Sequence, residues 1–296
     1  ILINNTYFKL KSKPISIAIT GDSAVGKTTL TNFLNQYFGN NFVDNIVLDS
    51  FHKHERDSDM WKRNTHLNPE MNNLEEFKNT VFKLFEGQTE IVKNYNHLTG
   101  KFDSSTKKKI KNFLIIEGLH SLYFHDLNKK YDLKVYLDLG EEIKNKTKIS
   151  RDIERGKTQE NIFKEIEQRK NDYIEFIAPQ ANFADLYINT LSRDKDSLIF
   201  EVFFNNDYFA EFEHLIKEIK SCTLLNKNLK PGLVNFEISI DKIDATIFFE
   251  VLTSQLINLQ TGNFTKLDIN ISENNEIIIK TALILYMLNK KMLYRL

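Results

Sequence analysis

The chain has 296 residues, of which 41% are hydrophobic and 27% charged, so it can bury a large core in one α/β domain or in a domain with an appendage. Forty basic residues balance forty acidic ones, which argues against nucleic acid or an anionic membrane as a partner. The single cysteine, Cys222, cannot form an internal disulfide, and we expect a cytoplasmic protein.

The ends of the chain carry little chemistry. The sequence begins with Ile1 rather than Met, so we expect the natural N-terminus to lie upstream, and residues 1–13 predict a lead-in strand or a ragged end. The longest apolar stretch, residues 281–288, is too short to span a bilayer.

Residues 15–34 predict a strand, a phosphate-binding loop and a helix. Alternating isoleucines precede the pattern G-x-x-x-x-G-K-T, and apolar residues at helical spacing follow it. Lys27 is expected to reach the β- and γ-phosphates of a nucleotide, and the Thr28 hydroxyl to hold Mg²⁺. A glycine-containing turn before a helix is the alternative interpretation. The expected nucleotide-binding residues are Gly21, Asp22, Ser23, Ala24, Val25, Gly26, Lys27, Thr28 and Thr29.

A second buried strand is predicted at residues 42–48, and it leads into the sequence LDSFHKHER. Ligands of open α/β sheets collect at the carboxyl ends of the strands, so a second substrate is expected here. Asp49 suits a general base, while His52 and Arg56 supply positive charge for an anionic acceptor. Spacing alone leaves a solvated loop as the alternative.

The next segment predicts a helix over residues 74–86, with its apolar face in the core and Gly87 as its stop. A strand over residues 90–95 leads into the turn NHLTGKF, where His97 and Lys101 could approach a phosphate. The basic run 107–111 is interpreted as a solvated turn.

Residues 113–116 predict a fully buried parallel strand that ends at Glu117. A carboxylate at a strand end beside a phosphate loop can hold the hydrated Mg²⁺ that bridges the β- and γ-phosphates. Gly118 permits the turn, and His120 is expected to point back to the same edge. Another strand is predicted at residues 132–138.

A helix over residues 141–156 places four charged residues on one surface: Lys148, Arg151, Asp152 and Arg155. This pattern is typical of a surface helix with ion pairs. The alternative is a lid whose arginines bind the transferring phosphoryl group, with Asp152 as a second metal-side carboxylate or an alternative base. A second helix over residues 159–176 and a strand over residues 184–189 follow.

The chain changes character near residue 191. Strands are predicted at 198–204, 233–240 and 267–271, with a helix near 208–221 and a closing helix at 277–290. We therefore expect a core that carries the phosphate loop at 1–190 and a mixed, β-rich extension of unknown role at 191–296.

The order GDSAVGKTT, LDSFHKHER, YNHLTG, IIEGLHSLY, KVYLD, KISRDIERG and RKNDYIEFIAPQ resembles the phosphoribulokinase and uridine kinase family over residues 15–189. Within that family, the spacing of Asp49, His52 and Arg56 and the motif from Tyr95 to Gly100 look like phosphoribulokinases. RDIERG is one residue shorter than the family's usual RD-x-x-x-RG, which leaves the role of Arg155 open. The paired regulatory cysteines of plant-type members are missing, so redox control of that kind is not inferred.

This resemblance implies an α/β P-loop kinase fold, with a mostly parallel sheet flanked by helices. It implies Asp49 as the base and Glu117 on the metal, and it matches Arg151 and Asp152 to the family's lid-side segment. Together with Lys27 of the phosphate loop, Asp49, Arg151 and Asp152 are the expected catalytic residues. The residues that it places around the acceptor, or matches to the family's lid-side segment, are His52, Arg56, Tyr95, His97, His120, Lys148 and Arg155.

The expected function is an ATP- and Mg²⁺-dependent kinase for a small sugar phosphate, with ribulose 5-phosphate as the first choice. One alternative is a uridine kinase-like enzyme or another sugar or polyol kinase, such as one serving surface-polysaccharide synthesis. Another is a module that binds ATP without transferring phosphate. The expected partner is thus a small molecule, either a sugar phosphate or a nucleoside, and homo-oligomerisation is left open.

Overall fold

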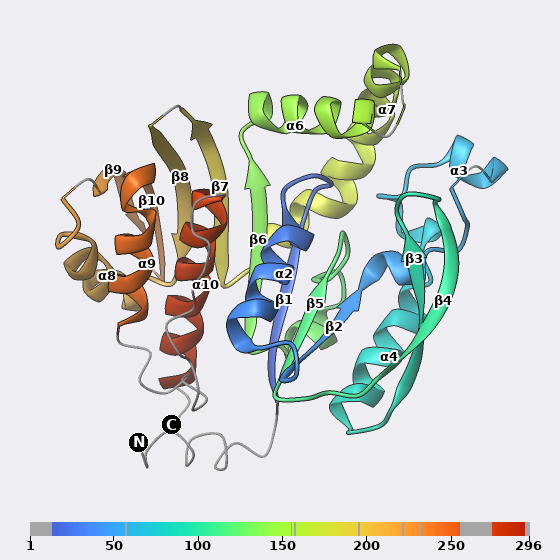
Figure 1. Ribbon diagram of the computed structural model, residues 1–296, viewed down its shortest axis with the longest axis horizontal. Coiled ribbons are helices and arrows are strands. Elements are labelled where there is room, and N and C mark those ends of the chain that lie inside the picture. The colour runs from blue at the N-terminus through green and yellow to red at the C-terminus, as the bar shows by residue number, and fades with distance from the viewer. Residues whose placement is uncertain are drawn as a thin grey trace.

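The structure is a computed structural model, and it describes residues 14–56, 58–154, 156, 158–194, 196–220, 222–230, 232–254 and 274–293. An eight-stranded sheet runs through the molecule in the order β2-β5-β1-β6-β7-β8-β10-β9 (Figure 1). The first five strands in this order are parallel, and the last three pair antiparallel. Their bounds are β2 Val43–Val47, β5 Phe113–Glu117, β1 Ile15–Gly21, β6 Leu133–Leu139, β7 Leu186–Arg193, β8 Ser197–Phe204, β10 Leu233–Asp241 and β9 Cys222–Lys230.

Helices cover both faces of this sheet (Figure 1). The α-helices are α2 Lys27–Phe38, α3 Asp59–Arg63, α4 Leu74–Phe85, α5 His125–Asn128, α6 Glu141–Glu154, α7 Gln159–Asp172, α8 Phe209–Ile216, α9 Ala245–Thr253 and α10 Asn275–Leu293. A separate two-stranded sheet, the β3–β4 hairpin, pairs Glu90–Asn96 with Lys101–Lys108. The predicted fold class is therefore confirmed: a mostly parallel sheet lies between layers of helices.

Strand β5 shows why the sheet is covered on both sides. All five of its residues are buried, and successive side chains of a strand point to opposite faces. Phe113 and Ile115 join a core with α2, α8, α9 and α10, whereas Leu114 and Ile116 join a second core with α4. Long apolar runs of this kind are typical of parallel strands with helices on both faces.

The C-terminal part continues the same sheet and the same core. Strand β8 pairs with β7, and the larger apolar cluster contains Ile17 of β1 together with Phe200 of β8 and Leu285 of α10. Helix α10 is buried over almost its whole length and packs against α2 and α9. The extension thus packs directly against the helix that follows the phosphate loop.

Most predicted elements are confirmed, with several differences. Strand β4 was not predicted, and the basic run 107–111, expected as a turn, partly forms its end. Strand β9 and helices α3, α5 and α9 were not predicted either. The second predicted helix, 159–176, ends as an α-helix at Asp172 and continues as a π-helical turn over Tyr173–Ile177. The expectations for residues 1–13 and for a strand at 267–271 lie outside the described residues.

In the part of the chain that the structure describes, none of the helices has the length and apolar character needed to cross a membrane.

Candidate active site

The phosphate loop joins β1 to α2 in a conformation that depends on glycine. Gly21 has φ +136°, and a Cβ there would stand 2.1 Å from the Leu137 carbonyl oxygen, so no other residue fits. Gly26 (φ +91°) and Ala24 (φ +69°) also have positive φ. The Lys27 ammonium donates to the carbonyl oxygens of Gly21 (2.9 Å) and Asp22 (2.7 Å). Two carbonyl oxygens of the loop thus hold the Lys27 ammonium in place.

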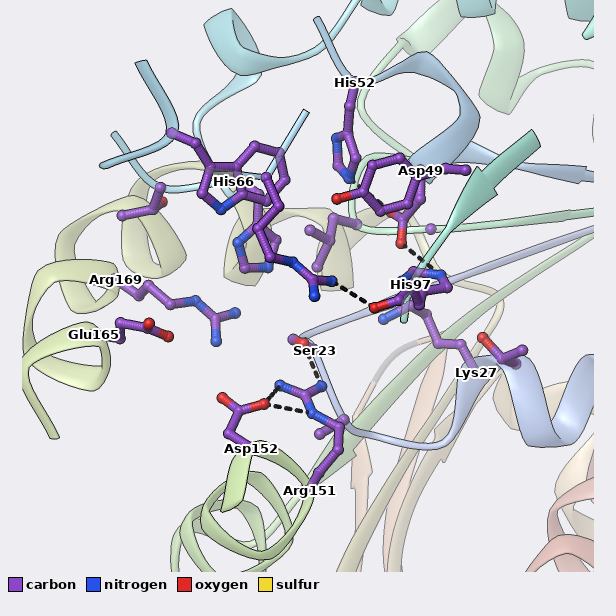
Figure 2. A pocket seen from close by; sticks show the side chains of 18 of the residues that line it. Ser23, Lys27, Asp49, His52, His66, His97, Arg151, Asp152, Glu165 and Arg169 are labelled. Atoms are coloured by element: carbon purple, nitrogen blue, oxygen red, sulfur yellow. Dashed lines mark hydrogen bonds and ion pairs between the residues drawn. The ribbon is translucent and has the colours of Figure 1, made fainter. Parts of the chain in front are cut away.

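A cleft of about 860 Å³ opens beside this loop, at the carboxyl ends of β1, β2 and β5. Figure 2 shows side chains from several elements that converge on it. Of the predicted residues, the lining includes Ser23, Ala24, Gly26, Lys27, Thr28, Thr29, Asp49, His52, Arg56, Tyr95, His97, Glu117, Arg151 and Asp152. Gly21, Asp22, Val25, His120 and Lys148 are not among the lining residues, and Arg155 lies outside the described residues.

Asp49 lies between two histidines on the wall formed after β2. It belongs to the 3₁₀ turn Leu48–Phe51, and its carboxylate oxygens stand 3.6 Å from His52 Nε2 and 3.3 Å from His97 Nε2 (Figure 2). Burial raises the pKa of Asp49, but His52, His97 and Lys27 outweigh it, so the net pKa is lowered. Asp49 is therefore an ionised carboxylate directed toward the cleft.

The imidazole ring of His52 is held in place through its second ring nitrogen, Nδ1. Its Nδ1 lies 2.7 Å from Asn72 Oδ1, and the two residues also form an isolated β-bridge. Asn72 donates in turn to the carbonyl oxygens of His66 and Asn68. The contact between Nδ1 of His52 and the Asn72 amide oxygen orients the imidazole ring so that Nε2 faces Asp49.

The β3–β4 hairpin supplies a third part of the cleft. The Arg56 amide donates to the Gly100 carbonyl (2.8 Å), and its guanidinium donates to the His97 carbonyl (2.9 Å). Gly100 has φ +71°, and a Cβ there would stand 2.4 Å from Arg56 Cβ. Arg56 and His97 are thus held next to each other by the tight turn of the hairpin.

Glu117 and Thr28 fit a magnesium ion. Glu117 is 3% exposed at the end of β5, and its Oε2 has no hydrogen-bond partner among the described residues. Burial, with the nearby Asp49 carboxylate, outweighs Lys27 and a hydrogen bond with Thr28, so the pKa of Glu117 is raised to about 7. A buried carboxylate oxygen next to a threonine hydroxyl and a phosphate loop suits a hard cation that also contacts phosphates. The described residues hold no group of three or more His, Cys, Asp or Glu side chains that could bind a metal by themselves.

His120 is buried behind the cleft wall. Burial, together with nearby His52, lowers its pKa to about 3, so its imidazole is neutral at physiological pH. Its ring meets Tyr123 edge-on. His120 is close enough to Asp49 for that carboxylate to influence its pKa, but it is not among the residues that line the cleft.

Helix α6 carries the basic residues of the opposite wall. Arg151 donates to the Ser23 hydroxyl of the phosphate loop (2.8 Å) and pairs with Asp152 (2.7 Å), as Figure 2 shows. Lys148 is buried, and burial, with Arg169 nearby, lowers its pKa to about 7. Arg151 therefore reaches from α6 to the phosphate loop, and Asp152 is engaged by that arginine.

Three further residues of the cleft carried no assigned role in the sequence. Arg169 of α7 pairs with Asp22 of the phosphate loop at 2.7 Å, and the RKNDY motif could have indicated it. Trp61 and His66 stack with nearly parallel rings, 5.9 Å between centroids. No motif marked this pair, because nothing local in a polar loop shows that it returns to the cleft.

The family model described as Phosphoribulokinase / Uridine kinase family matches residues 16–197, more than half of the chain. The chain belongs to this family. Phosphoribulokinase of Synechocystis is 37% identical over 193 residues, which are 64% of this chain and 58% of that protein. The chloroplastic phosphoribulokinase of Chlamydomonas reinhardtii is 34% identical over 199 residues, covering 61% and 53%. The chain thus spans just over half the length of these two relatives.

Two further members of the family bear on the comparison. A uridine kinase of Clostridium perfringens is 29% identical over 183 residues, covering 60% of this chain and 87% of that protein. The solved structure of phosphoribulokinase from Rhodobacter spheroides matches with a TM-score of 0.64 and 18% identity, over 83% of this chain and 97% of that one. This structural likeness shows a shared fold that extends beyond the family's matched segment.

Proposed function

We propose that this family member is an ATP-dependent kinase that phosphorylates a hydroxyl group of a small sugar phosphate. The observation that carries the proposal is Asp49, an ionised carboxylate held between His52 and His97 in the cleft that also contains Lys27 of the phosphate loop. A module that only binds nucleotide needs no such carboxylate beside the phosphates.

In the proposed reaction, Asp49 accepts the proton of the acceptor hydroxyl while the hydroxyl oxygen attacks the γ-phosphorus of ATP. The bond between that phosphorus and the β,γ-bridging oxygen breaks, and ADP leaves. The lowered pKa of Asp49 keeps it deprotonated at neutral pH. Lys27 and Arg151 face the transferring group from the phosphate loop and from α6, where their charge stabilises the transition state. Mg²⁺ would be held by Thr28 and Glu117, and it supplies further charge neutralisation on the phosphates.

The basic groups beside Asp49 favour an acceptor that already carries a phosphate. Arg56 and His97 are adjacent in the cleft, and His52 stands on the other side of Asp49. Cationic and imidazole donors of this kind bind phosphate oxygens strongly. Together with the 37% identity to the Synechocystis phosphoribulokinase, they support ribulose 5-phosphate as the acceptor.

A uridine kinase-like function is the second candidate. It is favoured by the rings of Trp61, His66 and Tyr95, which line the same cleft and could stack on a nucleobase. The Clostridium perfringens uridine kinase matches over 87% of its own length.

An ADP-release assay over pentose phosphates, free pentoses and nucleosides separates these candidates. We expect turnover with ribulose 5-phosphate and, at equal concentration, at least a hundredfold lower kcat/KM with uridine. Activity on uridine without activity on ribulose 5-phosphate would establish the second candidate. Nucleotide binding without turnover of any acceptor would show a binding module instead.

A further inference from the structure

Helix α6 makes polar contacts with the rest of the molecule near its start, near its middle and near its end. At its start, the Gly140 amide donates to the Thr190 carbonyl (2.8 Å) and Lys144 pairs with Asp138 (2.7 Å). Near its end, Arg151 donates to the Ser23 hydroxyl of the phosphate loop. Between these, the Thr147 hydroxyl accepts a hydrogen bond of 3.1 Å from Nη1 of Arg193. The donor in this middle contact, Arg193, is the last residue of β7, where the chain enters the C-terminal part.

Arg193 is itself fixed by the C-terminal helix. Its Nε and Nη2 donate to the two carboxylate oxygens of Glu276, at 2.7 and 3.2 Å, in a bidentate pair. Glu276 also accepts from the Thr190 hydroxyl (3.0 Å) and from the Lys280 ammonium (2.7 Å). Bidentate pairs of arginine with carboxylate are geometrically specific, so Nη1 of Arg193 is left in a defined place.

This carboxylate is protected from water and stays charged. The Glu276 side chain is 12% exposed and that of Lys280 only 1%. Burial opposes ionisation of Glu276, but Lys280 and Arg193 outweigh it and hold its pKa at about 2. Glu276 stands in the first turn of α10, where the helix dipole also favours a negative charge. The anchor therefore persists across the physiological pH range.

The attachment point on α6 lies one helical turn before Arg151. Residues four apart share a helix face, and both Thr147 and Arg151 line the cleft. In Figure 1, α6 lies across the end of the sheet while α10 packs beside α2. The path from Glu276 through Arg193 and Thr147 thus joins the C-terminal helix to the arginine that contacts the phosphate loop.

We propose that Arg193, held by Glu276, is a positioning residue that sets where α6 places Arg151 over the phosphate loop. The inference rests on the proposed function, because it assumes that Arg151 acts on the transferring phosphoryl group. It gives the C-terminal helix a role in catalysis without any contact between that helix and a substrate.

The attachment itself is tested by hydrogen exchange of the α6 amides. Thr147→Val removes the acceptor hydroxyl with little change of shape, and Arg193→Met removes the donor while Lys280 still pairs with Glu276. Lys146→Met is the matched control, because Lys146 is exposed on the same helix and, among the described residues, its ion pair is with Glu142. We expect faster exchange in α6 for the first two variants than for the control. Equal exchange rates of the α6 amides in the three variants would show that the hydrogen bond between Arg193 and Thr147 does not hold the helix.

The catalytic consequence is tested by kcat with ATP and the preferred acceptor. We expect Thr147→Val to lower kcat about threefold to tenfold, the size of one hydrogen bond, with the acceptor KM unchanged. Thr147→Val added to Arg151→Ala should have no further effect, because the arginine through which it acts is gone. An equal loss in both backgrounds would overturn the positioning role.

Arg193→Lys distinguishes geometry from charge. Lysine keeps the positive charge but lacks the fixed fork that reaches Glu276 and Thr147 together, so this variant should behave like Thr147→Val. Wild-type kcat in Arg193→Lys would overturn the proposal. Should the wild-type chain turn over no acceptor, the proposed function and the positioning role both fall, while hydrogen exchange still decides whether the attachment exists.

Discussion

At the scale of single residues, Asp49 is the group on which the proposed chemistry depends. Asp49→Asn keeps the shape of the side chain but removes its capacity to accept a proton. We expect kcat to fall by about 10²- to 10⁴-fold, the usual contribution of a general base, with nucleotide affinity changed less than about threefold. Steady-state kinetics and calorimetric titration with a non-hydrolysable ATP analogue measure the two quantities.

Asp126→Asn is the control for this substitution, because Asp126 is an exposed carboxylate on α5 that pairs with Lys78. It should leave both quantities as in the wild type. A kcat for Asp49→Asn within tenfold of the wild-type value would remove Asp49 from the base role.

Glu117 makes the stability of the protein depend on pH. Its pKa is raised from 4.5 to about 7 by burial, so the folded state holds this proton more tightly than the unfolded state. The stabilisation by the protonated carboxyl is fully present below pH 4.5 and is lost as pH rises through 7. The shift corresponds to about 3 kcal/mol of unfolding free energy.

Glu117→Gln cannot lose a proton, so this variant should lack that contribution to the pH dependence. In chelator-containing buffer without nucleotide, we expect the variant to be more stable than the wild type at pH 8. Urea unfolding at several pH values between 4.5 and 8 provides the measurement. Parallel stability curves for the two proteins would show that Glu117 does not titrate in this range.

At the scale of elements, the turn of the β3–β4 hairpin controls the position of Arg56. Gly100→Ala would place a Cβ 2.4 Å from Arg56 Cβ at a positive φ, so either the turn or Arg56 must shift. We expect kcat/KM for the acceptor to fall about tenfold to a hundredfold, because small displacements in an active site have effects of this size. Kinetics with varied acceptor and saturating ATP provide the measurement.

Gly87→Ala controls for backbone strain alone, since Gly87 also has positive φ but a Cβ there meets nothing within 4 Å. It should cost only about 1–2 kcal/mol of stability and leave kcat/KM unchanged. Equal kinetic effects of the two substitutions would disconnect the hairpin turn from the acceptor.

The elements that the sequence predicted best are those with the strongest apolar patterns. The strands at 15–19 and 113–116 and the phosphate loop follow from local sequence, because buried parallel strands are apolar throughout and the loop has a specific motif. Strand β4 was missed because KFDSSTKK is almost wholly exposed in a two-stranded ribbon and has no apolar alternation. Its backbone pairing with β3 stabilises it instead.

The candidate site was predictable where a motif preceded each residue and not where the tertiary fold brought residues together. Lys27 was named from the phosphate-loop motif, and Asp49 and Glu117 from their positions at the ends of predicted strands. Arg193 and Thr147 are 46 residues apart in the chain, and neither belongs to a motif. Their contact depends on how β7 and α6 pack, which spacing alone does not reveal.

At the scale of the whole molecule, the two sides of the predicted boundary at residue 190 share one sheet and one apolar core. A chain ending at residue 190 would lose β8, the partner of β7, and the apolar faces of α8, α9 and α10. We expect it to show no cooperative thermal unfolding when followed by circular dichroism. A cooperative transition together with binding of an ATP analogue would establish residues 1–190 as a domain of its own.

The cleft is assembled from two separate sheets. The phosphate loop follows a central strand of the eight-stranded sheet, whereas Tyr95 and His97 belong to the two-stranded hairpin and its turn. Under the proposed function, we expect substitutions in the hairpin to alter acceptor recognition without changing the phosphate loop. Under that function, selection for a new acceptor is expected to act first on the hairpin, because changes there leave the phosphate loop unaltered.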